Sequence, residues 1–446
     1  MNTTDNFGHA LSGASADSAQ LYATALHQLQ CYRQDPVATI ESATASRPDF
    51  VMGHVLHAWL HLLGTEPAAL ATARRDLELA ESLSGNARER EHAAAIGKLL
   101  QGHWRDAARV LEDLSIAYPN DALALQAGHV LDFYLGDARM LRDRIARALS
   151  AWAASMPGYH AVLGMHAFGL EETGAYARAE TVGRAALDLE PHDAWAHHAV
   201  THVLEMQCRA REGIAWMRGR ERDWAEDNFF AVHNWWHLAL YHLDLDEIDE
   251  ALALYDAAVR ASHSTLVLDL VDASALLWRL RLRGVDVGER WHEVAQGWRP
   301  SAGSGHYAFN DAHAMMAFVS DDGQDEAIRA LEAAQQRAMA GTGDNAMFTR
   351  EVGAPLTEAI RAFAQGHPAR TVQLLRPVRN IAQRFGGSHA QRDLIDLTLI
   401  EAAWADGQFA LARALAIERV DARPSSGRAR ALLQRSDSQG QYVIAG

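Results

Sequence analysis

The chain contains very little cysteine. Its 446 residues include only Cys31 and Cys208, which lie far apart and form no CxxC pair. Two distant cysteines argue against the disulfide framework that holds small secreted domains together, and they leave a thiolate metal site without support. The sequence therefore predicts a protein of a reducing compartment, and we expect a cytoplasmic location.

Long apolar runs and basic runs are also missing. No stretch of about 18 apolar residues occurs, and the first residues show no basic segment followed by an apolar one, so we expect neither a membrane-spanning helix nor a signal peptide. Lysine is scarce, the arginines are scattered, and the net charge is −16. Because nucleic-acid binding needs a basic surface, we expect no nucleic-acid partner.

Strand-like alternation of valine, isoleucine and threonine is nearly absent, and there are only 11 prolines. Alanine, leucine and arginine dominate instead. Apolar residues recur at steps of three and four in most windows, as in AARVLEDLSIAYP and AETVGRAALDLEP. This spacing places the apolar side chains on one face of a helix, so it predicts an all-α protein.

Small or polar turn residues recur at intervals that indicate a repeat. Most intervals measure 34 to 43 residues, and one of 77 residues spans about two periods. The turns fall near Gly102, Gly136, Gly174, Arg209, Asp246, Gly323, Gly366 and Gly407. Such a period is typical of paired helices in a solenoid. We therefore predict a right-handed superhelical α-solenoid of tetratricopeptide-like helix pairs, with a single domain over residues 1–430 and a flexible tail at 431–446.

The clearest repeat unit runs from Tyr159 to Pro191. Its Gly164, Gly174 and Ala179 match the small positions of the tetratricopeptide pattern. Small residues there let the two helices approach closely, and the proline ends the second helix. In such a stack the first helices line one concave surface, and from about residue 158 onward the residues suited to chemistry fall mostly on first helices. We therefore expect one internal functional surface.

His198, His202 and Glu205 share one helical face, because steps of four and three residues return to the same side. Two imidazoles at this spacing can bind a divalent metal, although the order H-x3-H-x2-E differs from that of HExxH hydrolases. Without a metal, His202 can act as a base that Glu205 orients. A hydrogen-bonded packing network is the third interpretation, and the sequence leaves all three open. We predict the three residues as catalytic.

The segment HNWWH repeats the pattern on the next first helix. His233 and His237 share a face, whereas paired tryptophans are typical of packing between helices. An indole beside an imidazole can also wall a ligand pocket. Two His-x3-His pairs on successive first helices favour a functional role. We predict His233 and His237 as catalytic, and Trp235 and Trp236 as substrate-binding.

Two later segments complete the candidate site. In FNDAHA, an aspartate can orient an imidazole or act as a ligand, and helix capping is the alternative. In GGSHAQRD, an arginine can hold a carboxylate or a phosphate through its paired donors, and a simple helix boundary is the alternative. We predict Asp311, His313 and His389 as catalytic, and Arg392 and Asp393 as substrate-binding.

Several of these segments together resemble the tetratricopeptide repeat protein 38 family. The resemblance runs from GMHAFGLEETGAYARAE through PHDAWAHHAVTHVLEMQCRAREGIAWM to HNWWHLALYHLDLDEIDEALALYD, and FNDAHAMMAF and GGSHAQRDLIDLTLIEAA are similar to later family segments. It covers roughly residues 40–420 and implies a superhelical all-α protein, but it brings no reaction with it. The family-like residues are His198, His202, Glu205, His233, Asn234, Trp235, Trp236, His237, Asp311, His313, His389, Gln391, Arg392 and Asp393. Cys208 stands where the family pattern leads us to expect glycine.

The candidate residues favour an enzyme with a His/Glu/Asp-rich concave pocket. It would act on a small polar molecule by acid–base chemistry: hydrolysis, elimination or isomerisation. No nucleotide or flavin fingerprint occurs, so we expect no redox cofactor; we assign no metal, and a divalent metal such as zinc is the alternative. The alternative function is a protein–protein interaction scaffold that holds a peptide in the groove, and a third is a small-molecule sensor without turnover. The oligomeric state is left open.

Overall fold

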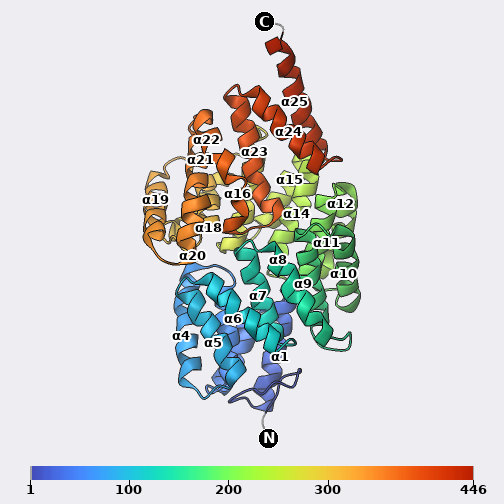
Figure 1. Cartoon of the computed structure of the whole chain (residues 1–446), viewed down its shortest axis with the longest axis vertical. Coiled ribbons are helices and arrows are strands. Elements are labelled where there is room, and N and C mark those ends of the chain that lie inside the picture. Colours follow the sequence, from blue (N-terminus) through green and yellow to red (C-terminus); the bar gives the residue numbers. More distant parts are fainter. Residues whose placement is uncertain (1–2, 445–446) are drawn as a thin grey trace. The chain divides into compact units, whose positions relative to one another are not determined.

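A computed structural model describes residues 3–444, with side chains described up to Asp437. Within this range the chain is built of helices, and its extended pairings are two isolated β-bridges, Thr4 with Ala10 and Arg33 with Asn228. Consecutive helices pack side by side as pairs, for example α5 (Ala87–Leu100) with α6 (Trp104–Ala117) (Figure 1). The predicted all-α helical-repeat fold is confirmed.

The chain divides into two compact units. Unit 1 comprises Met1–Val200, Arg220–Ala231 and Thr342–Asp344. Unit 2 comprises Thr201–Gly219, Val232–Gly341 and Asn345–Gly446. The helix α11 (Ala194–Met206) is continuous, and its residues from Thr201 onward belong to unit 2. The interpretation of residues 1–430 as one domain stays a prediction.

Both units consist of helices joined by short turns. Besides α5 and α6, unit 1 contains α1 (Ala16–Cys31), α2 (Pro36–Ser46), α3 (Val51–Leu62), η1 (Pro67–Ala69), α4 (Leu70–Ser82), α7 (Ala122–Tyr134), α8 (Ala138–Ala148), η2 (Leu149–Ala151), α9 (Tyr159–Glu172), α10 (Tyr176–Leu189) and α13 (Glu221–Ala225). Apart from Ala231 and Asp344, the first residues of α14 and α20, unit 2 contains α12 (Ala210–Arg218), α14 (Ala231–Asp244), α15 (Ile248–Leu254), η3 (Tyr255–Val259), α16 (Val267–Arg281), α17 (Arg290–Trp298), η4 (Arg299–Ser301), α18 (Ala308–Phe318), α19 (Asp325–Ala340), α20 (Asp344–Phe348), η5 (Thr349–Gly353), α21 (Ala354–Ala364), α22 (Pro368–Val378), η6 (Ala382–Phe385), α23 (His389–Ala405), α24 (Phe409–Ala422) and α25 (Gly427–Ile444).

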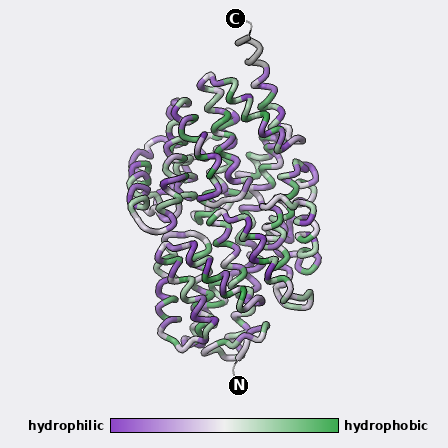
Figure 2. The backbone as a smooth tube through the Cα atoms, in the orientation of Figure 1, coloured by the Kyte–Doolittle hydropathy of each residue, from purple (hydrophilic) through white to green (hydrophobic). Residues whose placement is uncertain are grey.

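The second helices of the pairs are amphipathic. In α6, the buried positions Trp104, Ala107, Leu111 and Leu114 recur at steps of three and four, and charged residues occupy the opposite face. Figure 2 shows hydrophilic and hydrophobic stretches alternating along the helices in the same manner. Burial of one apolar stripe stabilises each such helix against its partner.

The first helices of unit 2 are buried on nearly every face. All residues of α18 are buried, and so are all residues of α16 apart from Leu268 and Arg281. Their packing partners α17, α21 and α23 belong to the same unit. A helix covered all round presents no open groove face. Polar side chains on these helices therefore face the interior of unit 2.

Most of the predicted turn residues adopt a left-handed backbone conformation. This conformation ends a helix, and glycine adopts it at low steric cost. Positive φ angles occur at Gly102, Gly136, Gly174, Asp246, Gly323, Gly366 and Gly407. The turn predicted near Arg209 is centred on Cys208, whose φ is 58°. The double interval of 77 residues is divided by Gly284 (φ 73°), which lies 38 residues after Asp246 and 39 before Gly323.

Cys208 carries a side chain in a conformation that costs an L-residue about 1–2 kcal/mol. We expect Cys208→Gly to raise the free energy of unfolding by about 0.5–1 kcal/mol, because the relief of strain exceeds the added flexibility of the unfolded chain. Urea unfolding followed by circular dichroism measures the change. Cys208→Ala keeps the Cβ and serves as the control; an equal gain from both variants would show that strain is not the cause.

Two further expectations concern a membrane-spanning helix and the C-terminal tail. Among residues 3–444, no helix is both long enough and apolar enough to cross a membrane. Residues 431–444 of the predicted tail belong to α25, and residues 445–446 lie outside the described range.

Candidate functional site

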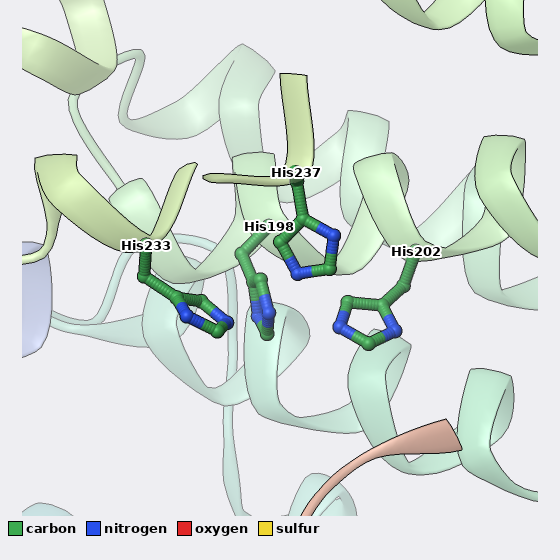
Figure 3. Close-up of side chains that lie close together, drawn as sticks. All are labelled: His198, His202, His233 and His237. Carbon is green, nitrogen blue, oxygen red and sulfur yellow. The ribbon is translucent and has the colours of Figure 1, made fainter. Parts of the chain in front are cut away.

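Histidines from two first helices meet in the interior. His202 lies on α11, and His233 and His237 lie one turn apart on α14. The ring centroids of His202 and His237 are 4.5 Å apart, and those of His233 and His237 are 4.9 Å apart. Figure 3 shows these side chains together with His198, one turn before His202; one ring nitrogen of each lies within 4.8 Å of the others. The structure therefore brings together the two His-x3-His pairs that the sequence singled out.

Two of these imidazoles are held by carboxylates of unit 2, the buried Asp272 and the partly buried Glu205. The Nδ1 atom of His233 lies 2.9 Å from both carboxylate oxygens of Asp272 on α16. The Nδ1 atom of His237 lies 3.0 Å from Oε2 of Glu205 on α11. A carboxylate that accepts from Nδ1 fixes the tautomer and the ring orientation, so that Nε2 becomes the basic nitrogen.

Burial also controls the charge of the histidines. Desolvation moves the pKa of His202 well below its ordinary value, and the neighbouring His237 acts in the same direction. Desolvation likewise lowers the pKa of His237, with His233 and Arg279 adding to the effect. Both rings are therefore neutral at pH 7, which is the form that accepts a proton or binds a metal.

A partly open cavity of about 60 Å³ in unit 2 adjoins this group. Glu205, which holds His237, lies in the cavity wall, and Tyr241 of α14 lies beside it. A cavity of this size holds about four water molecules, which is close to the size of a phosphate or a short carboxylate. A wider groove of about 690 Å³ shares Cys208, Asp244 and Arg428 with the cavity wall.

Arginine dominates the cavity wall. Five arginines and four carboxylates line it, which leaves one cation in excess. Four of the arginines pair with carboxylates: Arg419 with Asp393, Arg423 with Glu205, Arg283 with Asp246, and Arg428 with Glu401. The fifth arginine, Arg279, forms no ion pair among the described residues.

Arg279 lies near the end of α16 and is only 6% exposed. Its guanidinium donates to the backbone carbonyls of Ala275 and Ala390 and lies 5.4 Å from the centre of the Trp236 ring. Desolvation lowers its pKa to about 10, although Asp393 and Glu205 act in the opposite direction. Arg279 is therefore a buried cation at neutral pH with no carboxylate bound to it.

The two tryptophans that were predicted as substrate-binding have different surroundings. Trp236 is buried and stacks on His233 at 5.3 Å, whereas Trp235 lies under the Arg218 guanidinium of α12, at 5.4 Å. Trp236 thus belongs to the histidine group, and Trp235 packs toward α12.

On α18 the two predicted catalytic residues have different surroundings. The Nδ1–H group of His313 donates to the Phe309 carbonyl of its own helix at 2.9 Å, and burial together with the Arg279 charge lowers the pKa of His313 to about 4. Burial raises the pKa of Asp311 to about 7, although Gln335 acts in the opposite direction, and among the described residues its Oδ2 atom has no hydrogen-bond partner. Asp311 is not part of the cavity wall.

The GGSHAQRD segment forms the start of α23. Ser388 caps the helix and accepts from the Gln391 backbone N–H. His389 is close enough for its charge to lower the pKa of His202, and its Nδ1 lies 3.5 Å from Arg392. Asp393 lies in the cavity wall, where the arginine partner Arg419 keeps its pKa well below the ordinary value against the effect of burial. Asp393 therefore holds an arginine of the wall in place.

Similar histidine–aspartate pairs in unit 1 have a structural role. His160 on α9 lies 2.8 Å from Asp193, and His92 on α5 lies 3.0 Å from Asp121. In both pairs the aspartate also accepts from a backbone N–H three residues later at the start of a helix. Asp272 differs, because it lies inside α16 and both of its oxygens face His233.

Sequence reasoning missed Arg279, Arg419 and Arg423 and did not place Asp272 in the candidate site. The one available signal was the charged residues within the otherwise apolar α16 segment VLDLVDASALLWRLR. An arginine on a first helix that is apolar all round must be buried, which makes it a candidate for ligand binding.

Comparison with known proteins gives no assignment. No protein-family model matches the chain. The "Crystal Structure of the Yeast Tom70" is 12% identical, with 95% of this chain and 88% of that chain covered and a TM-score of 0.33. The "Crystal Structure of P58(IPK) TPR Domain at 2.5 A" is 15% identical, with 88% of this chain and 99% of that chain covered and a TM-score of 0.22. These scores are too low for a function to be carried over.

Proposed function

We propose that unit 2 binds a small anionic molecule in the cavity beside Arg279 and acts on it by acid–base chemistry. The observation that carries the proposal is the Arg279 side chain, which is buried and forms no ion pair among the described residues. A buried charge without a partner is costly, so proteins keep one mainly where a ligand neutralises it. A guanidinium binds carboxylates and phosphates through two parallel hydrogen bonds.

The histidine group supplies the acid–base element of the proposal. Glu205 belongs to the cavity wall and at the same time orients His237, whose ring contacts that of His202. A neutral imidazole that a carboxylate orients is suited to accept a proton and return it. Hydrolysis, elimination and isomerisation of an anionic substrate all require such a group, and the proposal extends to these three reaction classes.

Titration of phosphate and of malonate into the protein by isothermal calorimetry at low ionic strength tests anion binding. We expect saturable binding of one of the two anions to the wild type and an affinity lower by about tenfold or more in Arg279→Met, because hydrogen bonds to a charged group contribute about 1.5–3 kcal/mol. The unfolding free energy of Arg279→Met should stay equal or rise, since the variant removes a buried charge.

The matched control is Arg337→Met, which removes an exposed arginine of α19 in the same unit. It should bind the anions as the wild type does. Equal affinities of the wild type and Arg279→Met would contradict the proposal, and so would the absence of any saturable binding of phosphate, malonate and longer dicarboxylates.

The second candidate is a protein–protein interaction scaffold, which the helical-repeat architecture itself favours. The groove of about 690 Å³, with Arg209, Arg211 and Arg430 in its wall, would accept an acidic peptide. Arg211→Glu would then abolish capture of an acidic peptide and leave binding of small anions unchanged, whereas Arg279→Met would do the reverse.

The proposal also includes two finer assignments. The motifs HNWWH and GGSHAQRD support membership of the tetratricopeptide repeat protein 38 family within the wider class of helical-repeat proteins. The free thiols of Cys31 and Cys208 support a reducing cytoplasm as the place where the protein works.

A further inference from the structure

We propose that His202, His233 and His237 form a binding site for a divalent transition metal, with zinc as the first choice. All three histidines belong to unit 2. The inference deepens the proposed function and rests on it: a water molecule bound to the metal would take over the role of acid–base group beside the same cavity from the imidazoles. Metal binding itself can nevertheless be measured without any substrate.

The spacing of the nitrogens fits a shared ion. One ring nitrogen from each histidine lies within 4.8 Å of the others. Nitrogens around a tetrahedral zinc at about 2.0–2.1 Å lie about 3.3 Å apart, so each of the three rings has to move by about 1 Å or less toward the centre.

The carboxylates around the rings strengthen the argument. In metal sites, a ligating histidine usually donates its other ring N–H to a carboxylate, which orients the ring and raises its basicity. His233 has Asp272 in this position, and His237 has Glu205, both through Nδ1. Both Nε2 atoms are then the ligand atoms. The Asp272 carboxylate caps no helix, in contrast to Asp121 and Asp193 of the structural pairs, so orienting His233 is the role that its geometry indicates.

The kind of ligand selects the metal. Imidazole nitrogens suit zinc, copper, nickel and iron, whereas calcium and magnesium prefer oxygen ligands. Three histidines leave one position of a tetrahedral zinc open for water or substrate, as in catalytic zinc sites. Since Glu205 belongs both to the cavity wall and to the surroundings of His237, the metal would lie one residue away from the anion cavity.

A competing group in unit 1 has to be distinguished. His27, Cys31 and His160 also lie within 4.8 Å of one another. Burial raises the pKa of the Cys31 thiol out of the physiological range, and Asp193, which caps a helix, already holds His160. This group therefore fits a metal less well, and its thiol gives it a separate spectroscopic signature.

Titration of Co²⁺ into the untagged, EDTA-treated full chain tests the site by visible absorption. We expect one Co²⁺ per chain, with the d–d bands of a tetrahedral nitrogen site, and displacement of Co²⁺ by Zn²⁺. His237→Ala and His233→Ala should abolish these bands. Asp272→Asn keeps all the ligands and should weaken Zn²⁺ binding by about 10–100-fold, which keeps the test decisive if an alanine variant fails to fold.

Three control variants separate this site from its surroundings. Cys31→Ser and His160→Ala should leave the bands unchanged, whereas a thiolate-to-cobalt charge-transfer band would assign the metal to unit 1 and overturn the inference. Arg279→Met should bind Co²⁺ normally, so loss of anion binding and loss of metal binding are distinguishable. The inference is also overturned if the wild type binds no stoichiometric Co²⁺ or if Asp272→Asn binds Zn²⁺ as tightly as the wild type.

Discussion

Replacement of Asp132 with asparagine is expected to lower the free energy of unfolding by about 3–5 kcal/mol, because it leaves a buried guanidinium without its counter-ion. Arg144 on α8 is 1% exposed. Its Nε and Nη2 atoms donate to the two carboxylate oxygens of Asp132 at 2.7 and 2.8 Å, and Nη2 also donates to the Ala108 carbonyl. The guanidinium lies directly against Gly128, where a Cβ would come within 2.8 Å of it, so the arginine has no room to turn away.

Urea unfolding followed by far-ultraviolet circular dichroism measures this loss. The control is the double variant Asp132→Leu with Arg144→Met, which replaces the pair by apolar side chains of similar size. We expect the double variant to lie within about 2 kcal/mol of the wild type, because an apolar replacement of a buried ion pair is often neutral or stabilising. A loss below about 1 kcal/mol in Asp132→Asn would contradict the account of Arg144.

Asp311→Asn is expected to abolish a pH dependence of stability of about 3 kcal/mol between pH 5 and pH 8. Asp311 is 6% exposed, and burial raises its pKa to about 7. In the unfolded chain an aspartate loses its proton near pH 3.9, whereas in the folded chain Asp311 keeps its proton up to about pH 7. Between these values the unfolded chain binds fewer protons, so stability falls as the pH rises and is level above pH 7.

Unfolding measured at pH 5 and pH 8 for both proteins gives the difference. Asp311→Asn should be more stable relative to the wild type at pH 8 than at pH 5, because asparagine has no proton to lose. Asp325→Asn, at the start of α19, is the control and should show the pH dependence of the wild type. An Asp311→Asn variant whose stability relative to the wild type is the same at both pH values would show that Asp311 is ionised in the fold.

Arg144 and Arg279 illustrate two uses of a buried arginine. Arg144 has a bidentate carboxylate partner, so the ion pair holds α7 and α8 together. Arg279 has only backbone carbonyls and an indole around it. We therefore expect different effects on the free energy of unfolding. It falls when the partner of Arg144 is removed, and it does not fall when Arg279 itself is removed.

Helical periodicity and turn chemistry predicted the fold. Glycine at a helix end adopts a left-handed conformation that other residues avoid, so the repeat could be read from Gly102, Gly136 and Gly174. Gly284 was not among the predicted turn residues, although the interval of 77 residues implied a further turn between Asp246 and Gly323. The division into two units depends on contacts between distant segments, such as residues 342–344 with unit 1, which no local pattern encodes.

The histidines of the candidate site were predicted by their spacing, because residues four apart on a helix lie on the same face. The pairing of His233 with Asp272 and of His237 with Glu205 was not predicted, since it depends on how α14 packs on α16 and α11. Trp235 was predicted as substrate-binding together with Trp236; consecutive residues on a helix point about 100° apart, and in the structure Trp236 stacks on His233 whereas Trp235 lies beside Arg218. The Arg279 cation was overlooked because a single arginine carries no spacing pattern.

The central claim is that a cavity in unit 2 binds an anion through Arg279. Crystals of the protein soaked in selenate, with data collected at the selenium absorption edge, test this claim most directly because the anomalous signal locates the anion. The account predicts a selenium peak inside the cavity, within salt-bridge distance of the Arg279 guanidinium, and its loss in Arg279→Met. Peaks confined to exposed arginines, with only water beside Arg279, would contradict the account.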